Sequence, residues 1–547
     1  MPNVTLEHFE RAAADIGAHG DNDMLPFDID TRFVSHKQAE LAHAAFAFFE
    51  QLQRDSEQNS STKVTALSVF SERLLAPTGP TGFRVATKIQ PFWNIYLNGL
   101  GVAIADALED DRDGRVHSYR FLRNGGHELF DRTFSWKAFR EATVADASAG
   151  GPGTVIVQTD ISSFYQHISH HHIENFIDDL FPENERIGNQ INALLNKFSS
   201  GRSFGLPIGG QCSRILAELF LNPVDHRMTG AGIQWHRYVD DYVLIARSQA
   251  DAYRALSFLS HTLADYGLTL NKTKTVMFAS RHYLDYVISQ LGADDDEARQ
   301  LRQIDLHFDP YSDTSVDDYE SLKQTVESLE VQKLLNRELE KALPDTFLVT
   351  QIGRTLKLQE PTVAIQLATT LLSQGNLHAF RASWSTIMRG VANLRATEEF
   401  TDIFITLDQI LDVIPEHSAH LLQAEASLLH YLRTLRFKRT PPRAAFVQQI
   451  YDATRSDTVK RACIDCWRQW KDRGGFTFIR NRWNELSADC QRLVWLAASA
   501  FGDQGEGFKR QIRPNLDHAW RLGIERQNTA SYASIYQEWC DDPQASA

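Results

Sequence analysis

The chain has 547 residues, of which 43% are hydrophobic and 23% are charged, and this balance is typical of a folded globular protein rather than a disordered or fibrous one. Its length predicts two to four folding units. The net charge of −14 is unfavourable for binding nucleic acid, but residues 430–547 contain 19 Lys and Arg against 13 Asp and Glu, so a basic excess is confined to the last part of the chain.

Signals for secretion or membrane insertion are absent from the sequence. No apolar run approaches the ~18 residues of a membrane span, and the N-terminus lacks the basic and then apolar order of a secretory signal. Five cysteines in so long a chain form no even disulfide framework, which indicates a reducing compartment. We therefore expect a cytoplasmic protein with no membrane partner.

The first 75 residues are predicted to be mainly helical. Residues 41–54 space their apolar positions by three and four, and a Gly- and Pro-rich turn at 76–82 ends this segment. Strand-like and helical stretches then alternate as far as residue 290. These patterns predict an N-terminal helical segment at 1–75 and a mixed α+β domain at 76–305.

From residue 315 onward, helical patterns recur with short breaks and little β-branched alternation. They predict an all-α domain at 306–547, and their spacing is typical of a HEAT-like solenoid, although no repeated sequence signature accompanies it. Cys463 and Cys466 form a lone CxxC in this region. Since a zinc site normally has a second ligand pair, packing within a helix is the favoured interpretation, and the function of the pair stays open.

A carboxylate is expected at the end of a buried strand. The apolar run VIVQTD (155–160) predicts a strand that ends at Asp160. Tyr165 follows five residues later, where its ring can form a wall that excludes a ribose 2′-hydroxyl. A strand ending in Asp more often has a structural explanation, so this motif needs a partner elsewhere in the chain.

That partner is the pair Asp240 and Asp241 in QWHRYVDDYVLIA (234–246), which we predict at the tip of a tight hairpin, because Asp tolerates the backbone angles of such a turn. Two adjacent carboxylates between apolar residues repel each other unless a cation neutralises them. Oxygen ligands suit Mg²⁺, and two ions roughly 3.5–4 Å apart can activate a 3′-hydroxyl and stabilise the leaving pyrophosphate. We therefore predict nucleotidyl transfer with two Mg²⁺ ions, or Mn²⁺, held by Asp160, Asp240 and Asp241, with Ile161 also among the metal ligands.

The order of these motifs resembles the palm of reverse transcriptases. SFGLPIGGQCSRILAELFLNPVD (203–225) resembles the family's next motif, a Gly/Pro loop that opens a helix and cradles template and incoming nucleotide. Ile208 stands where many reverse transcriptases have Gln, so the template contact departs from the family pattern. YGLTLNKTKT (266–275) resembles the following motif, which implies that Lys274 lies near the triphosphate and protonates pyrophosphate. The resemblance implies the following nucleotide-binding residues: Tyr165, Gly209, Gly210, Gln211 and Arg120.

Within that family, DISSFYQHISHHHIEN (160–175) and VHSYRFLRNGG (116–126) most resemble bacterial defence-associated reverse transcriptases of the abortive-infection type, which belong to the unknown-group class. Those proteins join fingers and palm to an α-helical, HEAT-like C-terminal domain. The resemblance implies a DNA polymerase, either RNA-templated or template-independent, that acts in antiphage defence. Its implied partners are dNTPs, a template or non-coding RNA, the DNA product, a second copy of the chain and a phage-encoded trigger.

Several alternatives stay open. Some relatives prime synthesis from a side-chain hydroxyl of the helical domain, and the sequence does not choose among the tyrosines of the C-terminal region, Tyr431, Tyr451, Tyr532 and Tyr536. Other fingers and helix cations could meet phosphate: Lys88, Arg115 and Arg214. The basic clusters at 433–443 and 479–483 are either phosphate contacts or solvated helix faces. A retron-like or mobile-element reverse transcriptase and a non-catalytic RNA-binding sensor scaffold are the alternative functions. The long helical tail disfavours the first, and the complete set of carboxylates disfavours the second.

Overall fold

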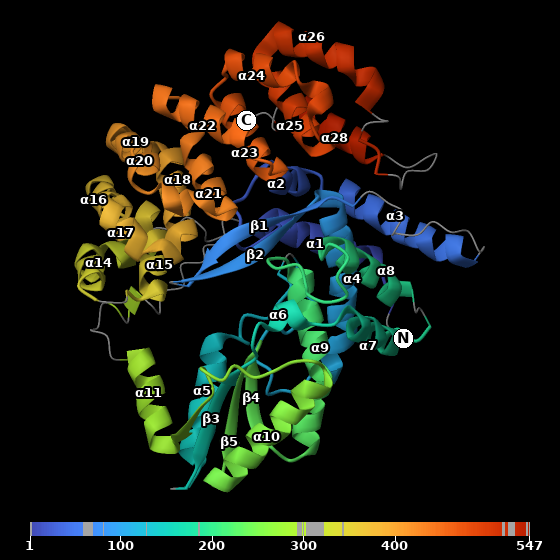
Figure 1. The fold of residues 1–547 in the computed structure, drawn as a ribbon, viewed down its shortest axis with the longest axis vertical. Helices are drawn as coiled ribbons and strands as arrows, with labels where there is room; N and C mark the ends of the chain where they lie inside the picture. Colours follow the sequence, from blue (N-terminus) through green and yellow to red (C-terminus); the bar gives the residue numbers. More distant parts are fainter. Residues whose placement is uncertain are drawn as a thin grey trace.

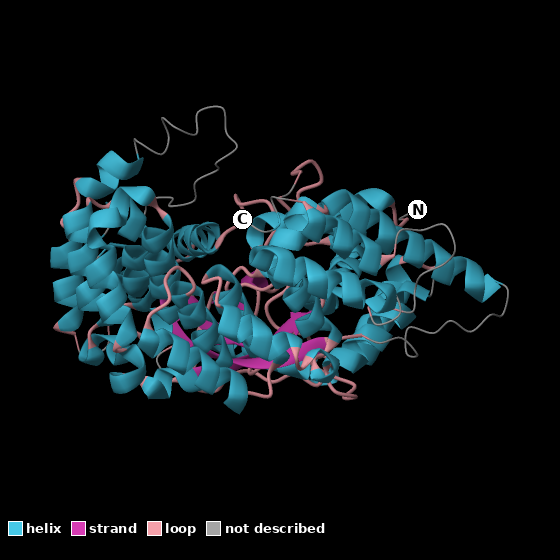
Figure 2. Ribbon diagram, turned by 90° about the horizontal axis from the view of Figure 1, so that it is seen from above, coloured by secondary structure: helices cyan, strands magenta, loops and turns pink. Residues whose placement is uncertain are grey.

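The structure is a computed structural model that describes residues 3–57, 69–79, 81–126, 128–151, 153–183, 186–292, 298, 300–301, 322–341, 344–516, 520–522, 531–542 and 545. A four-stranded sheet with its helices lies at the bottom of Figure 1, a long hairpin and the N-terminal helices lie in the middle, and the C-terminal helices arch over the top. Viewed from above, helices form most of the molecule and the strands lie among them (Figure 2).

The N-terminal part combines helices with a two-stranded hairpin. Its elements are α1 (Leu6–His19), α2 (Ile29–His36), α3 (Gln38–Glu57), β1 (Ser71–Thr78), β2 (Gly82–Ile89) and α4 (Pro91–Leu108). The Asp28 carboxylate caps α2 by accepting hydrogen bonds from the backbone N–H groups of Asp30 and Thr31. Because α4 is apolar on almost every side, it is buried along its length and forms the centre of this part.

The helical prediction for the first 75 residues is wrong at its end. Strand β1 begins at Ser71 and pairs with β2 in an antiparallel register, and the Gly- and Pro-rich turn forms the tip of this hairpin. Pairing with β2 therefore decides the conformation of a segment that has little local preference of its own.

The four-stranded sheet is antiparallel, with the strand order β4-β5-β3-β6. Its strands are β3 (Val155–Asp160), β4 (Gln234–Tyr238), β5 (Asp241–Ala246) and β6 (Val276–Ala279), and the helices of this part are α5 (Trp136–Ala149), α6 (Phe164–His167), α7 (His170–Leu180), α8 (Arg186–Phe198), α9 (Gln211–Gly230), α10 (Gln249–Asp265) and α11 (Ser280–Gly292). Successive side chains alternate between the two faces: Ile156 and Val243 pack with residues of α5 and α11, whereas Val157 and Leu244 join the main core. Helices therefore cover the sheet on both faces and fix its register.

A close helix contact sets the position of α9. This helix follows the segment at 205–210, which we call the Gly-rich loop. A Cβ on Gly101 of α4 would lie 2.8 Å from Sγ of Cys212, so only glycine lets α9 approach α4 at this point. The start of α9 is thereby fixed against the buried central helix.

The C-terminal region consists of helices, which confirms the all-α prediction for the described residues there. They are α14 (Val331–Leu339), α15 (Thr346–Thr355), α16 (Pro361–Leu372), α17 (Gln374–Ala379), α18 (Trp384–Ala396), α19 (Phe404–Asp412), α20 (Ile414–His417), α21 (Glu425–Leu435), α22 (Pro441–Ala453), α23 (Asp457–Gln469), α24 (Arg473–Arg480), α25 (Ala488–Ala498), α26 (Gly502–Ile512) and α28 (Tyr532–Asp541). Short 3-10 helices link several of these elements. Helices α15, α18, α21, α23 and α25 form a row in which each packs against the next. The HEAT-like repeat itself stays a prediction.

The N-terminal and C-terminal parts are in direct contact. Helix α2 lies beside α28, and α21 packs against β1 (Figure 1). The Phe33 ring packs against Tyr536 and Trp539, and Arg461 of α23 pairs with Asp30. Whether the chain divides at the predicted boundaries therefore stays a prediction, because one core crosses them. In the part of the chain that the structure describes, none of the helices has the length and apolar character needed to cross a membrane.

Candidate active site

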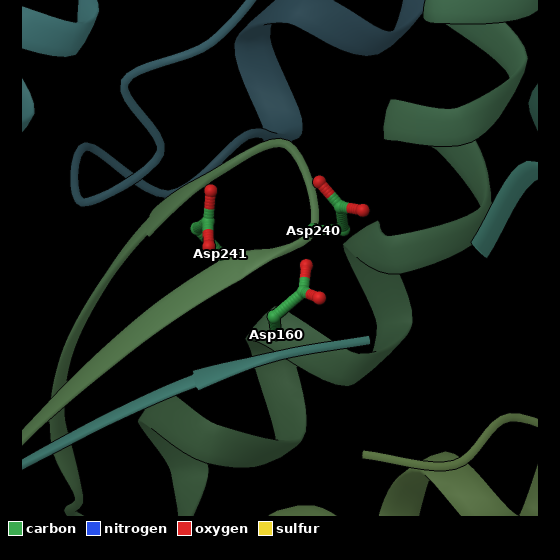
Figure 3. A group of neighbouring side chains, drawn as sticks. All are labelled: Asp160, Asp240 and Asp241. Atoms are coloured by element: carbon green, nitrogen blue, oxygen red, sulfur yellow. The ribbon is translucent and has the colours of Figure 1, made fainter. Parts of the chain in front are cut away.

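Three carboxylates converge at one end of the four-stranded sheet (Figure 3). Asp160 is the last residue of β3 and pairs across the sheet with Asp241, the first residue of β5. Asp240 lies in the turn between β4 and β5. One oxygen from each carboxylate lies within 4.8 Å of the others. The hairpin and the pairing of β3 with β5 thus bring together residues that are 80 positions apart in the chain.

The strain in this turn falls on a residue that the sequence did not single out. We expected the aspartates to adopt the unusual backbone angles, but Val239 has a φ of 55°, in the left-handed region that a β-branched residue rarely adopts. Two hydrogen bonds hold it there: its N–H donates to Oγ of Ser118 at 3.0 Å, and its carbonyl accepts from Nη1 of Arg237 at 2.9 Å. Buried polar contacts thus support a strained conformation next to the carboxylates.

The carboxylates differ in how they are compensated. Lys274 Nζ lies 2.9 Å from Oδ2 of Asp160, and this hydrogen bond raises the pKa of Lys274. Neither Asp240 nor Asp241 has an ion-pair partner among the described residues. Burial, together with the charge of Asp160, raises the pKa of Asp240 to about 7 and that of Asp241 to about 6.

Such an arrangement fits divalent metal. Hard carboxylate oxygens are the ligands that Mg²⁺ prefers, and a cation between them would remove the repulsion that disfavours ionisation of Asp240 and Asp241. These three side chains are therefore the residues that would hold the ions. Ile161 follows Asp160 directly, and its N–H donates to the carbonyl of Asp240 at 3.1 Å, so its backbone belongs to the same corner.

A cavity of about 560 Å³ opens beside the carboxylates. Its wall combines the Gly-rich loop with aromatic rings and three cations, and the residues that matter here are Asp23, Arg84, Tyr119, Trp136, Tyr165, Ile208, Gly209, Gly210, Arg214, Tyr238 and Lys274. Burial raises the pKa of Tyr165, so its hydroxyl stays protonated. The cavity has the polar, cationic wall that a nucleoside triphosphate requires.

The structure places most of the predicted nucleotide-binding residues in this wall. Tyr165, Gly209, Gly210 and Lys274 all line the cavity. Gln211 does not: it begins α9, and its Oε1 accepts a hydrogen bond from Nη1 of Arg214, which does line the cavity. Gln211 therefore orients a neighbour rather than facing the cavity itself.

The prediction that Arg120 binds nucleotide is wrong in this structure, because Arg120 does not line the cavity. Its Nε donates to Glu109, and Nη1 donates to the carbonyl of Asp113 at 3.0 Å, so its guanidinium is held at the end of α4. Lys88 is likewise buried, among Asp21, Asp28 and Asp30. Arg115 donates to Thr229 outside the wall. Arg120 and Lys88 are therefore paired with nearby acids, and Arg115 is bonded to a threonine.

Of the three cations in the cavity wall, Lys274 was predicted, whereas Arg84 and Arg214 were not among the predicted nucleotide-binding residues. Arg214, one of the cations that could meet phosphate, pairs with Asp23 and lines the cavity, so its contact with phosphate stays a prediction. Arg84 extends from β2 and was not singled out. Asp23 comes from the loop between α1 and α2, far from any motif, so no local signal could have found it. Position within the folded chain, not sequence pattern, selects these side chains.

The four tyrosines considered as primers lie in the interior of the helical region. Each side chain is buried, with at most 7% exposed. Tyr431 donates its hydroxyl to the carbonyl of Leu411 at 2.7 Å, and Tyr536 donates to that of Arg492 at 3.2 Å. Tyr451 packs against Trp467. All four side chains belong to the core, and their burial disfavours attack by any of these hydroxyls on a nucleotide.

The basic cluster at 433–443 is largely neutralised within the helical region. Arg443 is 1% exposed and pairs with Asp408 and Asp412. Arg439 pairs with Asp472, and Lys438 lies 3.7 Å from Asp408. The two cysteines of the CxxC are buried in α23, in agreement with a packing role.

Comparison with known proteins gives the family of this site. Residues 104–290, which include all three carboxylates, match the profile of the family described as "Reverse transcriptase (RNA-dependent DNA polymerase)". The chain carries a reverse-transcriptase domain. The Retron Ec86 reverse transcriptase of Escherichia coli is 24% identical over 251 residues, which cover 44% of this chain and 74% of that protein. These matches support a nucleotidyltransferase of the RNA-directed DNA polymerase class for the domain at 104–290.

Among solved structures, telomerases resemble this chain weakly. Apo telomerase from Candida tropicalis, truncated from the C-terminal domain, is 13% identical and matches 38% of this chain and 49% of its own, with a TM-score of 0.29. Telomerase from Candida albicans in complex with the TWJ fragment of telomeric RNA is 12% identical over 63% of this chain and 65% of its own, with a TM-score of 0.31. A further apo telomerase structure from Candida tropicalis is 12% identical, and the match covers 77% of this chain and 74% of its own, with a TM-score of 0.33. The chain spans about half the length of the first of these, and scores this low support no statement about function.

Proposed function

We propose that this protein is a DNA polymerase that acts in antiphage defence and that uses two Mg²⁺ or Mn²⁺ ions held by Asp160, Asp240 and Asp241. The observation that carries the proposal is the convergence of these carboxylates within a reverse-transcriptase domain, where two of them have no cation partner among the described residues. The antiphage role rests on the resemblance of the motifs to abortive-infection reverse transcriptases. Assembly with a second copy, a HEAT-like helical domain and recognition of a phage-encoded trigger belong to the same proposal.

Each residue of the site has a distinct task in nucleotidyl transfer. Metal ions held by the three carboxylates would supply the positive charge that lowers the pKa of a primer 3′-hydroxyl and stabilises the leaving pyrophosphate. The position of these ions would be set by Asp160, Asp240 and Asp241. Ile161 lies beside them. Lys274 holds a proton at Nζ next to the carboxylates and can deliver it to pyrophosphate.

The nucleotide itself is selected by the cavity wall. Tyr165 is partly buried against the core and lines the same cavity as Asp160, where its ring would stand against a ribose 2′-hydroxyl. Gly209 and Gly210 bring backbone close to the incoming dNTP. The cavity therefore favours dNTPs over ribonucleotides.

A second groove beside the cavity is suited to a nucleic-acid strand, such as an RNA template. It has a volume of about 220 Å³, shares Gln166 and Ile208 with the cavity, and continues to Arg73, Arg202 and Phe204. No carboxylate occurs among the described residues that line it, although the chain as a whole carries a net charge of −14. Phosphate groups of a nucleic-acid strand are therefore favoured in this groove.

The groove also offers a base a surface for stacking. The Phe204 ring is 42% exposed, and the Arg202 guanidinium lies 5.7 Å from its centroid. Phe204 forms a bridge with Ser169, and the next N–H, from Gly205, donates to the carbonyl of Ile168 at 2.8 Å, so the ring is held in place. Exposed aromatic rings beside arginines are typical of single-strand binding surfaces.

A second candidate function is a retron-like reverse transcriptase that copies its own RNA. It is favoured by the 24% identity with the Escherichia coli retron enzyme over most of that protein's length. A structured RNA that co-purifies with the protein and serves as its template would support this alternative. The scaffold alternative is disfavoured, because a sensor without catalysis has no need for three converging carboxylates.

Incorporation of labelled nucleotides tests the proposed function. Purified protein, with its co-purifying nucleic acid retained, is incubated with Mg²⁺ and each labelled dNTP or NTP. DNA product is expected from the wild type and from the control Asp503→Ala, which alters an exposed carboxylate of α26, but not from Asp240→Ala. Phage protection is expected to disappear with the same variant. Protection retained by Asp240→Ala would overturn the enzymatic account, and protease-sensitive product would show a protein primer other than the four buried tyrosines.

A further inference from the structure

The loop between α1 and α2 reaches into the structure that surrounds the nucleotide cavity. Asn22 lies in this loop and is 3% exposed. Its Nδ2 donates to two carbonyls, those of Thr87 and Ile208, each at 3.1 Å, and its Oδ1 accepts from the N–H of Met24 at 2.9 Å. The buried amide of Asn22 therefore links the α1–α2 loop to β2 and to the Gly-rich loop. Its NH2 group donates two hydrogen bonds and its oxygen accepts one.

Asn22 also explains why a glycine is needed at 209. Gly209 has a φ of 114°, and a Cβ added there would lie 2.1 Å from Nδ2 of Asn22. Its carbonyl accepts a hydrogen bond from the N–H of Asp23 at 3.1 Å. The backbone of the Gly-rich loop is thus pressed against the α1–α2 loop at the point where both border the cavity.

The next residue of the loop holds a cation of the cavity wall. Oδ2 of Asp23 lies 2.6 Å from Nη2 of Arg214, and the other end of that guanidinium is bonded to Gln211. The guanidinium also lies 5.2 Å from the centroid of the Tyr119 ring. Three contacts from three segments therefore set the direction of Arg214, and Asp23 supplies the charged one.

The helical region anchors the same loop from the other side. His430 of α21 is buried, and its Nε2 lies 3.2 Å from the carbonyl of Met24. Farther along the loop, Asp28 pairs with the buried Lys88 at 2.8 Å, and Asp30, at the start of α2, pairs with Arg461 of α23. The α1–α2 loop is therefore fixed between the C-terminal helices and the nucleotide cavity.

We propose that Asn22 and Asp23 are positioning residues for nucleotide binding: Asn22 sets the place of the Gly209 backbone, and Asp23 sets the direction of the Arg214 guanidinium. This inference rests on the proposed polymerase function. Both residues precede the segment at 104–290 that matches the reverse-transcriptase family, so the N-terminal part completes a pocket that the matched domain alone leaves open. The contacts of Asn22 and Asp23 do not include the metal-binding carboxylates. Replacing either residue is therefore expected to change nucleotide affinity more than the chemical step.

Two double-mutant cycles test the proposal in the full-length protein. In the first, Asn22→Ala and Gly209→Ala are made singly and together. Each single variant is expected to raise KM for dNTP by about tenfold with kcat changed less than about threefold. In the double variant, KM is expected to rise by less than the product of the two single-variant increases. The reason is that truncating Asn22 removes the atom that a Cβ at position 209 would strike.

The second cycle combines Asp23→Ala with Arg214→Ala. If Asp23 acts through Arg214, the double variant raises KM no more than the worse single variant does. Gly232→Ala is the matched control for backbone strain, because Gly232 has a φ of 68° but no atom lies within 4 Å of its would-be Cβ. That control is expected to leave KM unchanged. Fully multiplicative effects in both cycles, or a fall in kcat with KM unchanged, would overturn the proposal.

Hydrogen exchange separates this inference from the polymerase function, because it needs no activity. In wild type, the Thr87 N–H donates to the carbonyl of Ile208 at 3.0 Å. Asn22→Ala is expected to speed exchange in peptides that cover 20–26 and 84–90, while peptides of α25 keep the wild-type rate. If wild type fails to incorporate nucleotides but this pattern is seen, the polymerase proposal fails and the positioning role stands. If wild type is active and exchange in these peptides does not change, the positioning role is refuted.

Discussion

Replacing Asp240 with Asn should stabilise the metal-free protein at pH 8 even though it abolishes polymerisation. Burial, and then the charges of Asp160 and Asp241, raise the pKa of Asp240 from 3.8 to about 7. A carboxyl whose pKa is higher in the folded than in the unfolded state stabilises the fold at low pH. This contribution disappears as the pH rises from about 4 to about 7, when the carboxylate becomes charged in both states. At pH 8 the folded protein therefore carries an unfavourable charge that the Asn variant lacks.

The size of this effect follows from the pKa. A change from 3.8 to about 7 corresponds to about 4 kcal/mol, since a change of one in pKa is about 1.4 kcal/mol. The repulsion is shared among three carboxylates, and Asp240 is partly exposed, so we expect about half of this, roughly 2 kcal/mol. For a folding unit of about 200 residues, that amounts to a rise of about 4–8 °C in Tm.

Thermal unfolding at pH 5 and pH 8, in EDTA and in Mg²⁺, measures the effect. In EDTA at pH 8 the Asp240→Asn variant is expected to melt above wild type, and the difference should shrink at pH 5. Mg²⁺ should stabilise wild type more than the variant, because the variant has lost a ligand. Asp503→Asn, an exposed carboxylate, is the control and should show no such pattern. A variant that melts below wild type in EDTA at pH 8 would refute the claim that the carboxylates repel one another.

Three further predictions concern the cavity and the groove. Tyr165→Ala should raise the ratio of ribonucleotide to deoxyribonucleotide incorporation by about tenfold or more, measured as the ratio of kcat/KM values, and an unchanged ratio would show that another group excludes the 2′-hydroxyl. Lys274→Met should lower kcat by about 100-fold, as expected for loss of a general acid, whereas the exposed neighbour variant Lys272→Met should stay near wild type; equal losses would count against a specific role. Arg202→Glu should weaken binding of single-stranded RNA and flatten its dependence on salt concentration, with the slope reduced by about 1, and the remote control Arg510→Glu should bind as wild type does. If both charge reversals weaken binding equally, the groove has no special role.

The carboxylates were predictable because short-range patterns specify them. An apolar run that ends in Asp160 and two strand-like arms around Asp240 define a strand end and a hairpin, and each can be recognised within about a dozen residues. Once β3 pairs with β5, the register places Asp160 opposite Asp241. The sequence therefore located the three carboxylates and their place in the sheet, whereas the strained residue of the turn, Val239, was not predicted.

The cations were not predictable in the same way. Arg120, Lys88 and Arg214 all have long side chains, and the sequence gives no sign of which acid each will meet. In the fold, Arg120 meets Glu109, Lys88 is enclosed by acids of the N-terminal loop, and Arg214 meets Asp23 at the cavity. These pairings depend on contacts between distant segments, so a motif can locate the arginine but not the direction of its guanidinium.

Local pairing of charges also resolves the apparent conflict between an acidic chain and the proposed nucleic-acid substrate. Charge summed along the sequence pointed to the C-terminal cluster at 433–443, but in the fold Arg443 and Arg439 are paired with acids of the same region. Arg73 and Arg202 stand apart in the sequence, yet both line a groove whose described lining contains no carboxylate and which shares Gln166 and Ile208 with the active-site cavity. Because screening limits electrostatic attraction to about 10 Å, a strand responds to this local field and not to the net charge. An acidic protein can therefore bind a nucleic-acid strand at one acid-free groove, while its overall charge discourages binding elsewhere on the surface.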